Sequence, residues 1–161
     1  MTILMDSAVH CVAFSGDGSC IVSGSCDGCV QVWDALSGVE LKVFNSHTGL
    51  VQSVAFSSNG THIVSGSSDE SVQVWDALSG VELKVLNGHT GWVHCVAFSS
   101  DGTHIVSGSS DKSMRVWDLA NYNDLLWTYD SERSCITVAQ KTAPMFAYYI
   151  KTHVLLNADI I

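Results

Sequence analysis

Short runs of alternating or β-branched apolar residues recur along the chain, and clusters of turn residues separate them. The clearest set lies in the middle of the chain, with runs at 51–56, 62–67, 71–76 and 81–86. Runs of this length and pattern, bounded by Gly, Asn, Asp and Ser, predict the strands of a small antiparallel sheet. The sequence contains a single proline, Pro144, and no long helical pattern competes with the strand pattern. The chain is therefore predicted to be all-β.

This set of runs is one copy of a longer repeat. Trp33, Trp75 and Trp117 are spaced by 42 residues, and similar neighbours surround each of them. A fixed period of this length indicates a stacked array, in which each repeat buries its faces on the next one. We assign the array to residues 1–129, with repeats at about 8–44, 45–86 and 87–129.

Several short motifs return in phase with this period. Trp-Asp ends the third run of each repeat, Asn-Gly-His stands at 87–89, and the weaker Asn-Ser-His stands at 45–47. The motif Val-Ser-Gly-Ser-x-Asp ends at Asp27, Asp69 and Asp111. These motifs resemble the WD40 repeat family. The resemblance implies a partial β-propeller of WD40 type with three clear four-stranded blades.

Repeats two and three are close copies, which suggests recent duplication. In this respect the chain is similar to the repeat-rich tails of fungal signalling ATPases, although it contains no Gly-x-x-x-x-Gly-Lys-Ser/Thr motif for a nucleotide. Residues 130–161 match the repeat only in part. The 42-residue register places 138–139 in the first run of a further repeat, 145–150 in the second and 154–156 in the third. Two interpretations stay open, a degenerate fourth blade or an unrelated tail.

In the WD40 family, a His before the first strand, a Ser on the second, an Asp in the next turn and the Trp of the third strand form a hydrogen-bonded network. The resemblance places this network at His47, Ser65, Asp69 and Trp75 in repeat two, at His89, Ser107, Asp111 and Trp117 in repeat three, and at Ser23, Asp27 and Trp33 in repeat one. In repeat one, Met5 stands where the His would be. We therefore expect that the chain begins within an array or that this edge is unsealed.

A recurring Ser, His and Asp also suggests a hydrolase. A catalytic serine sits alone beside an oxyanion hole, often on a strained turn such as Gly-x-Ser-x-Gly. Here the trio occurs in two repeats, and its serine lies inside a β-branched run. We therefore predict that the network satisfies buried polar groups and that the protein is not an enzyme.

Charge and cysteine content exclude several other classes. The formal net charge of −9 opposes a phosphate backbone, so nucleic acid is not an expected partner. Most of the six cysteines stand where another repeat has a different residue, so we expect no disulfide framework. Cys26 and Cys29 have Cys-x-x-Cys spacing, but the second pair that a structural zinc needs is missing, so we expect no metal and no cofactor.

The sequence also lacks the usual signals for a membrane or for export. No apolar stretch approaches the roughly 18 residues that a membrane span needs. The first residues have neither a basic start nor a long apolar core, so they do not form a secretion signal. We therefore expect a cytoplasmic protein that makes no contact with a membrane.

The positions that differ between the near-identical repeats indicate where a partner binds. In the family, partners dock where the inner strands begin, at the third and fifth residues after the His and at the residue before the turn Asp. In this sequence those positions are Leu50, Gln52 and Ser68 in repeat two, Trp92, His94 and Ser110 in repeat three, and Ala8, His10 and Cys26 in repeat one. Trp92 is the strongest candidate, because an exposed Trp is a common binding anchor; packing between blades is the alternative.

From these features, we predict that the chain is a protein-interaction module, a scaffold or adaptor of WD40 type that binds a protein or peptide without catalysis. Open blade edges recruit other chains, so self-association is expected as well. Two alternatives remain, a truncated nonfunctional slice of a longer repeat protein and a hydrolase.

Overall fold

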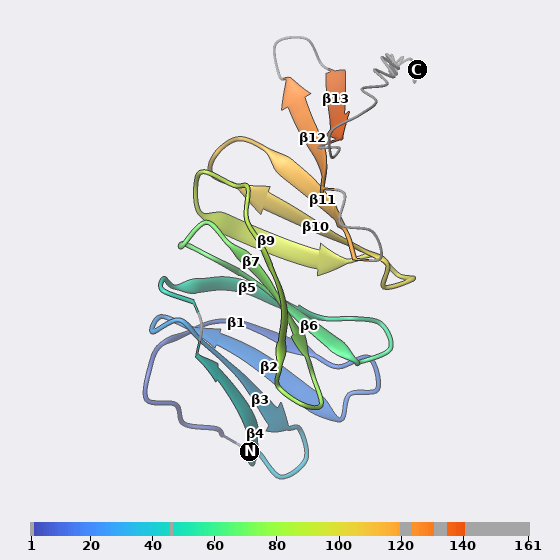
Figure 1. Ribbon diagram of the computed structural model, residues 1–161. Helices are drawn as coiled ribbons and strands as arrows, with labels where there is room; N and C mark the ends of the chain where they lie inside the picture. Colours follow the sequence, from blue (N-terminus) through green and yellow to red (C-terminus); the bar gives the residue numbers. More distant parts are fainter. Residues whose placement is uncertain (1, 46, 120–123, 131–134, 141–161) are drawn as a thin grey trace, which may run out of the picture.

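The computed structural model is a series of three antiparallel β-sheets that follow one another in chain order (Figure 1). It describes residues 2–45 and 47–119, together with the backbone of 124–130 and 135–140. Every regular element in these ranges is a β-strand, so the predicted all-β class is confirmed. Each sheet corresponds to one repeat of the sequence, and we call the sheets blades one, two and three.

The strands of each blade pair in the order in which they occur along the chain. Blade one contains β1 (Val9–Phe14), β2 (Cys20–Ser25), β3 (Cys29–Asp34) and β4 (Glu40–Asn45). Blade two contains β5 (Val51–Phe56), β6 (His62–Ser67), β7 (Val72–Asp76) and β8 (Glu82–Leu86). Blade three contains β9 (Val93–Phe98), β10 (His104–Ser109), β11 (Met114–Asp118), β12 (Asp124–Asp130) and β13 (Cys135–Gln140).

The strands of blade two match the four runs predicted between residues 51 and 86. β5 and β6 have the predicted bounds, whereas β7 and β8 each begin one residue later. The turn between β5 and β6 follows from its Asn-Gly pair. Asn59 Oδ1 accepts a hydrogen bond of 3.1 Å from the Thr61 N–H, and Gly60 has a φ of 71°, which residues with a side chain rarely adopt. This pair therefore closes the hairpin in its observed register.

The apolar cores lie between the blades. The core between blades one and two contains Val22, Val30, Val32, Phe44, Val51, Val54, Ile63 and Trp75. The core between blades two and three contains Val64, Val72, Val74, Leu86, Val93, Val96, Ile105 and Trp117. In the first core, Phe44 stacks on Trp75 with the ring centroids 4.9 Å apart. Each blade therefore depends on its neighbour for burial, as repeat arrays do.

β13 extends the third sheet to five strands. Its backbone pairs with β12 in antiparallel fashion along its whole length. The 42-residue period aligns 138–139 with 96–97 in β9, and so predicts the first strand of a further blade. In the structure this segment belongs to β13, at the edge of the third sheet farthest from β9. The runs at 145–150 and 154–156 lie outside the described residues. The domain boundaries and both interpretations of residues 130–161 therefore stay predictions.

Candidate functional site

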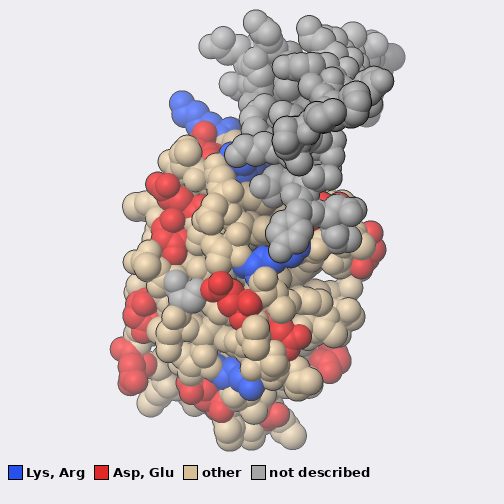
Figure 2. Space-filling view, in the orientation of Figure 1, with Lys and Arg blue, Asp and Glu red and all other residues tan. Residues whose placement is uncertain are grey.

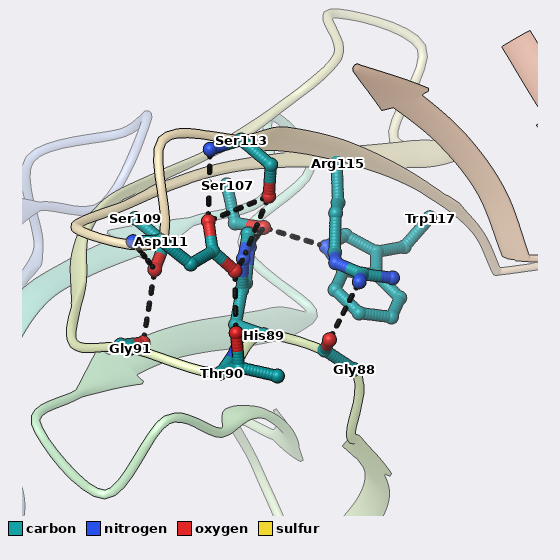
Figure 3. Close-up of polar contacts among 10 residues, drawn as sticks. All are labelled: Gly88, His89, Thr90, Gly91, Ser107, Ser109, Asp111, Ser113, Arg115 and Trp117. Atoms are coloured by element: carbon teal, nitrogen blue, oxygen red, sulfur yellow. Dashed lines mark hydrogen bonds and ion pairs between the residues drawn. The ribbon is translucent and has the colours of Figure 1, made fainter.

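A chain of four polar side chains joins the strands of blade three around His89 (Figure 3). The Nε1–H of Trp117 donates a hydrogen bond of 2.8 Å to Ser107 Oγ, and this hydroxyl lies 2.8 Å from His89 Nε2. On the other side of the ring, His89 Nδ1 lies 2.8 Å from Asp111 Oδ2. The structure thus brings together the four residues that the resemblance assigned to repeat three.

Blade two contains the same network. Trp75 donates to Ser65 Oγ at 3.1 Å, and Ser65 Oγ lies 2.7 Å from His47 Nε2. His47 Nδ1 in turn lies 2.8 Å from Asp69 Oδ2. The agreement with blade three to within a few tenths of an ångström reflects the near-identical sequences of the two repeats.

Blade one retains only part of this network. Trp33 donates to Ser23 Oγ at 2.9 Å, as its counterparts do. The Asp27 carboxylate bonds within its own turn. It accepts hydrogen bonds from the Ser25 hydroxyl and, at 3.1 Å, from the Cys29 N–H. Because no histidine stands between Ser23 and Asp27, the hydrogen bonds of the described residues do not connect them.

The hydrogen bonds of blade three fit a neutral histidine. Ser107 Oγ accepts the Trp117 N–H and can donate its own proton to His89 Nε2, in which case the Nδ1–H of the ring donates to the carboxylate. Burial lowers the pKa of His89 below its ordinary value of 6.5, and the attraction of Asp111 offsets this only in part. Burial lowers the pKa of His47 in the same way. Both imidazoles are therefore neutral at pH 7.

Asp111 connects two segments of blade three. The Ser113 N–H and hydroxyl donate to its Oδ1 at 2.8 and 2.6 Å, and the Thr90 N–H donates to its Oδ2 at 3.1 Å. Burial alone would raise the pKa of this carboxyl, but the hydrogen bonds from Ser113 and His89 outweigh it and hold the pKa well below the ordinary 3.8. The carboxylate therefore ties the loop before β9 to the turn between β10 and β11.

The same loop and turn approach each other closely at Gly91. A Cβ at this position would lie 2.8 Å from Ser110 Oγ and 2.9 Å from the backbone nitrogen of Asp111, so any side chain would force the two segments apart. Gly49 has the equivalent place in blade two, where a Cβ would lie 2.7 Å from Ser68 Oγ. This close packing holds the residue that follows Gly91, which is Trp92, in a defined position.

The geometry of the network does not suit a hydrolase. Ser107 is 1% exposed and Ser65 is fully buried, and each hydroxyl lies between an indole and an imidazole. A nucleophilic serine has to face a cleft that holds the substrate beside an oxyanion hole. The arrangement instead gives each buried polar group a partner, which is the requirement for burying such groups without a large cost in stability.

At the end of the strands where the network lies, backbone hydrogen bonds join two of the three predicted binding positions in every blade. In each blade, the N–H of the residue before the turn Asp donates to the carbonyl of the residue that precedes the first strand, which is β1, β5 or β9. These bonds are Cys26 to Ala8 at 3.0 Å, Ser68 to Leu50 at 2.9 Å and Ser110 to Trp92 at 3.0 Å. The predicted positions of one blade therefore form one contiguous surface.

The remaining position of each blade is the extra residue of a β-bulge. In blade one, the pairing register shifts between Val9 and Cys11, so His10 faces no paired residue in β2. Gln52 and His94 hold the same place in blades two and three. A bulge turns its extra side chain out of the regular alternation of the strand and often occurs beside binding sites. The family resemblance indicated these residues, whereas the bulge was not predicted.

Trp92 is the most prominent side chain of this surface. It is 55% exposed, and its ring meets that of His94 edge to face, with the centroids 6.4 Å apart. In blade three, Ser110 is exposed as well. The positions of blade one, Ala8, His10 and Cys26, are exposed, whereas those of blade two, Leu50, Gln52 and Ser68, are half-buried. Blade three therefore offers the largest accessible aromatic surface among these positions.

The described thiols form no disulfide and no metal centre. Cys11, Cys20, Cys26, Cys29 and Cys95 are free. Among the residues that the structure describes, no group of three or more His, Cys, Asp or Glu side chains could hold a metal ion. Cys26 and Cys29 lie on either side of the tight turn at Asp27 and Gly28, where Gly28 has a φ of 86°.

Charge is spread over the surface. Acidic side chains are scattered over the visible face, and basic side chains are few (Figure 2). Within the described part of the chain, no helix has the length and apolar character to cross a membrane. A groove between blades one and two, with Asp17, Lys42 and Phe56 in its walls, lies at the opposite end of the strands from Trp92. None of the predicted binding residues lines that groove.

Comparison with known proteins identifies the family. The family model described as WD domain, G-beta repeat, matches residues 4–34, 38–76 and 80–118, so the chain belongs to the WD40 repeat family. No curated protein matches the chain. Two solved structures, "Crystal structure of RRP9 WD40 repeats" and "Structure of U3-55K", are each similar with a TM-score of 0.72 at 21% identity.

Each of these alignments covers 84% of this chain and 52% of the other one. The chain therefore spans about half the length of the structures that it matches. The likeness establishes the fold, and together with the family match it confirms the predicted WD40-type partial propeller.

Proposed function

We propose that this chain is a protein-interaction module, a scaffold or adaptor of WD40 type that binds a protein or peptide and carries out no catalysis. The observation that carries this proposal is the half-exposed Trp92, which lies edge to face with His94 at the rim of blade three. An exposed Trp offers a large contact area and loses little conformational entropy on binding, so it commonly anchors an interface.

The surroundings of Trp92 support this role. Its carbonyl accepts the Ser110 N–H, the preceding Gly91 fits closely against the next turn, and His94 projects from a bulge. The anchor is therefore attached to a backbone that the hydrogen bonds of Asp111 hold in place. A surface that is organised before binding loses less free energy when the complex forms.

Two further features support a noncatalytic protein in a reducing compartment. The Ser, His and Asp that resemble a catalytic trio are buried and engaged in the blade network. The thiols of the described residues are free, which fits the cytoplasm. The net charge of −9 disfavours a nucleic acid as the direct partner and leaves a protein or peptide as the ligand.

A phage-displayed peptide library tests this proposal, since it requires no knowledge of the natural partner. Peptides selected on the wild-type chain are synthesised, and their affinities are compared between wild type, Trp92→Ala and Leu36→Ala. Leu36 is 92% exposed in the turn after β3, at the other end of the strands, so it is a matched loss of apolar surface. We expect Trp92→Ala to weaken binding by ~2 kcal/mol or more and Leu36→Ala to leave it unchanged.

The opposite results would count against the proposal. Failure of the folded wild-type chain to select any peptide would favour the alternative of a nonfunctional slice. Peptides that bind both variants equally well would place the interface away from Trp92. Covalent labelling of Ser107 by a fluorophosphonate probe, lost in Ser107→Ala, would favour the hydrolase.

A further inference from the structure

The groove between blades one and two lies at the end of the strands opposite to Trp92. The turn between β1 and β2 lines it, together with the turn between β5 and β6, strand β4 and the turn after β7. Two of these turns are in direct contact, because a Cβ added to Gly16 would lie 2.9 Å from the carbonyl oxygen of Ser58. The groove has a volume of about 590 Å³, within the range of about 300–1,000 Å³ that is usual for binding sites. It can therefore accept a few side chains of a ligand.

The interior of the groove is apolar. Val32 belongs to the core between blades one and two, and Phe56 and Ala77 pack against that core. Two leucines on the walls remain accessible, since Leu41 is 47% and Leu78 is 86% exposed. Covering such surface removes apolar area from water, which favours binding. The groove therefore suits a large apolar side chain.

The groove includes a position at which repeat one departs from the other two. Cys20 lines it and stands where repeats two and three have His62 and His104. A thiol is smaller than an imidazole ring, so this replacement leaves more of the groove open. The Cys20 thiol also provides a chemical probe of its occupancy.

One wall of the groove carries a permanent negative charge. Asp17 is exposed, and its Oδ1 accepts hydrogen bonds from the Ser15 hydroxyl at 2.7 Å and the Ser19 N–H at 3.0 Å. These bonds lower the pKa of Asp17 to about 2, so the carboxylate is ionised at physiological pH. Lys42 also lines the groove, but its ammonium group donates to the carbonyl of Ser79 at 3.4 Å. Together with the net charge of −9, the carboxylate favours a ligand that carries a positive charge.

Asn59 adds hydrogen-bond donors to another wall. Its Oδ1 accepts the Ser57 hydroxyl at 2.8 Å and the Thr61 N–H at 3.1 Å, both within its own turn. These bonds engage the oxygen of the amide, whereas its Nδ2 group carries two N–H donors. Because Asn59 is exposed, these donors are accessible to a carbonyl oxygen of a ligand.

We propose that this groove binds an extended peptide segment in which a basic side chain lies beside a large apolar one. The apolar side chain packs on Phe56 beside Leu41 and Leu78, the basic side chain pairs with Asp17, and a carbonyl of the peptide accepts a hydrogen bond from Asn59. The site is separate from the surface around Trp92 and does not depend on it. A chain with both sites holds two partners at opposite ends of its strands.

Selection of a phage-displayed peptide library on the Trp92→Ala variant tests this proposal, because the variant lacks the anchor of the other surface. The selected peptides should combine Lys or Arg with a large apolar residue, and their affinity should fall as the salt concentration rises. Failure to select any peptide, or selection of peptides without a basic residue, would overturn the proposal. Either result leaves the role of Trp92 intact, since that role is tested on the wild-type chain.

Two leucines in identical turns provide a matched pair of variants. Leu78 and Leu36 occupy the same place in the Ala-Leu-Ser-Gly sequences at 77–80 and 35–38, and both are highly exposed, but Leu36 does not line the groove. Leu78→Ser should weaken the selected peptides by about tenfold or more, because apolar contact area is lost. Leu36→Ser should leave their affinity unchanged. Equal effects of the two changes would contradict binding in the groove.

The charge has a matched pair as well. Asp17→Asn should weaken binding by about two- to fivefold and should reduce its dependence on salt, as expected for an exposed ion pair. Asp101→Asn makes the same change in the corresponding turn of blade three, outside the groove, and should have no effect. Both variants should fold, because blade two has Asn59 at this position. An unchanged salt dependence in Asp17→Asn would exclude the proposed ion pair.

Thiol labelling of the wild-type chain locates the bound peptide without any variant. Cys20 is half-buried in the groove, whereas Cys26 is exposed at the other end of the strands. A saturating concentration of a selected peptide should slow the reaction of Cys20 with iodoacetamide severalfold and leave the reaction of Cys26 unchanged. An unchanged rate at Cys20 would show that the peptide binds outside the groove, and would overturn the proposal.

Discussion

The indole N–H of Trp117 donates a hydrogen bond of 2.8 Å to Ser107 Oγ in the interior of blade three. This contact leaves the serine hydroxyl able to donate to His89, and the lowered pKa of His89 agrees with a neutral ring whose Nδ1–H donates to Asp111. Each of the four side chains provides a hydrogen-bond partner for a buried polar group that no longer contacts water. The network consequently specifies how the loop before β9 meets the turn after β10.

Asp111→Ala should lower the free energy of unfolding by about 1–3 kcal/mol, because it leaves the His89 N–H and the Thr90 N–H without an acceptor. Ser107→Ala should cost less. Urea denaturation followed by tryptophan fluorescence measures both changes. Asp27→Ala in blade one serves as the control, since its hydrogen bonds to the described residues lie within its own turn and none of them involves a histidine. A cost for Asp27→Ala equal to that for Asp111→Ala would refute the role of the histidine.

Stability should fall as the pH drops below about 6.5. The pKa values of buried His47 and His89 are lowered from 6.5, so the unfolded chain takes up protons at a higher pH than the folded chain. The stability that the neutral rings contribute is therefore present above pH 6.5 and is lost progressively below it. Asp69 and Asp111 have pKa values below the ordinary 3.8, so a second loss should follow below about that pH.

Denaturation midpoints from pH 7.5 to 4.5 test this dependence. His89→Gln should be less stable than wild type at pH 7.5 and should show a shallower decline between pH 7 and 5, because one of the two buried titrating rings is gone. A wild-type stability that rises as the pH falls through this range would contradict the account. It would show that the histidines fold in the charged form, paired with their aspartates.

The middle strands were predictable because the residues that define them act locally. Alternation of apolar residues, a turn such as Asn59-Gly60 and the 42-residue period placed β5 and β6 at their observed bounds. The fifth strand of blade three was not predicted. Its pairing partner is chosen by contacts along the edge of β12, and the periodicity of the sequence carries no information about such a contact.

The β-bulges were not predicted either, for a different reason. Val51 and Val54 both lie in the core that faces blade one, although they are three residues apart and strict alternation would place them on opposite faces. That odd spacing is the signal of an extra residue at Gln52, and it recurs at His10 and His94. The family resemblance supplied the network residues, whereas the exposure of Trp92 depended on packing and had to be observed.

The turn between β10 and β11 offers a way to stabilise blade three. Lys112 has a φ of 66°, in the left-handed region, and Gly28 occupies the equivalent position in blade one with a φ of 86°. In this conformation, a residue with a Cβ lowers the free energy of unfolding by roughly 1 kcal/mol through steric strain. Glycine avoids this strain, but part of the gain is lost because glycine gives up more conformational entropy on folding. Lys112→Gly should therefore raise the denaturation midpoint, whereas Lys112→Ala should leave it nearly unchanged. A lower midpoint for Lys112→Gly would show that the lysine side chain stabilises the turn.

The most direct measurement of the central claim is the affinity of a selected peptide for Trp92→Ala, taken together with the thermal melting of the same variant. We expect affinity to fall by ~2 kcal/mol or more while the melting temperature stays close to that of wild type, because blade two folds with Leu50 at this position. Unchanged affinity would place the partner elsewhere. A collapsed melting temperature would show that Trp92 belongs to the packing of the blade, and it would contradict the proposal that this residue anchors an interaction surface.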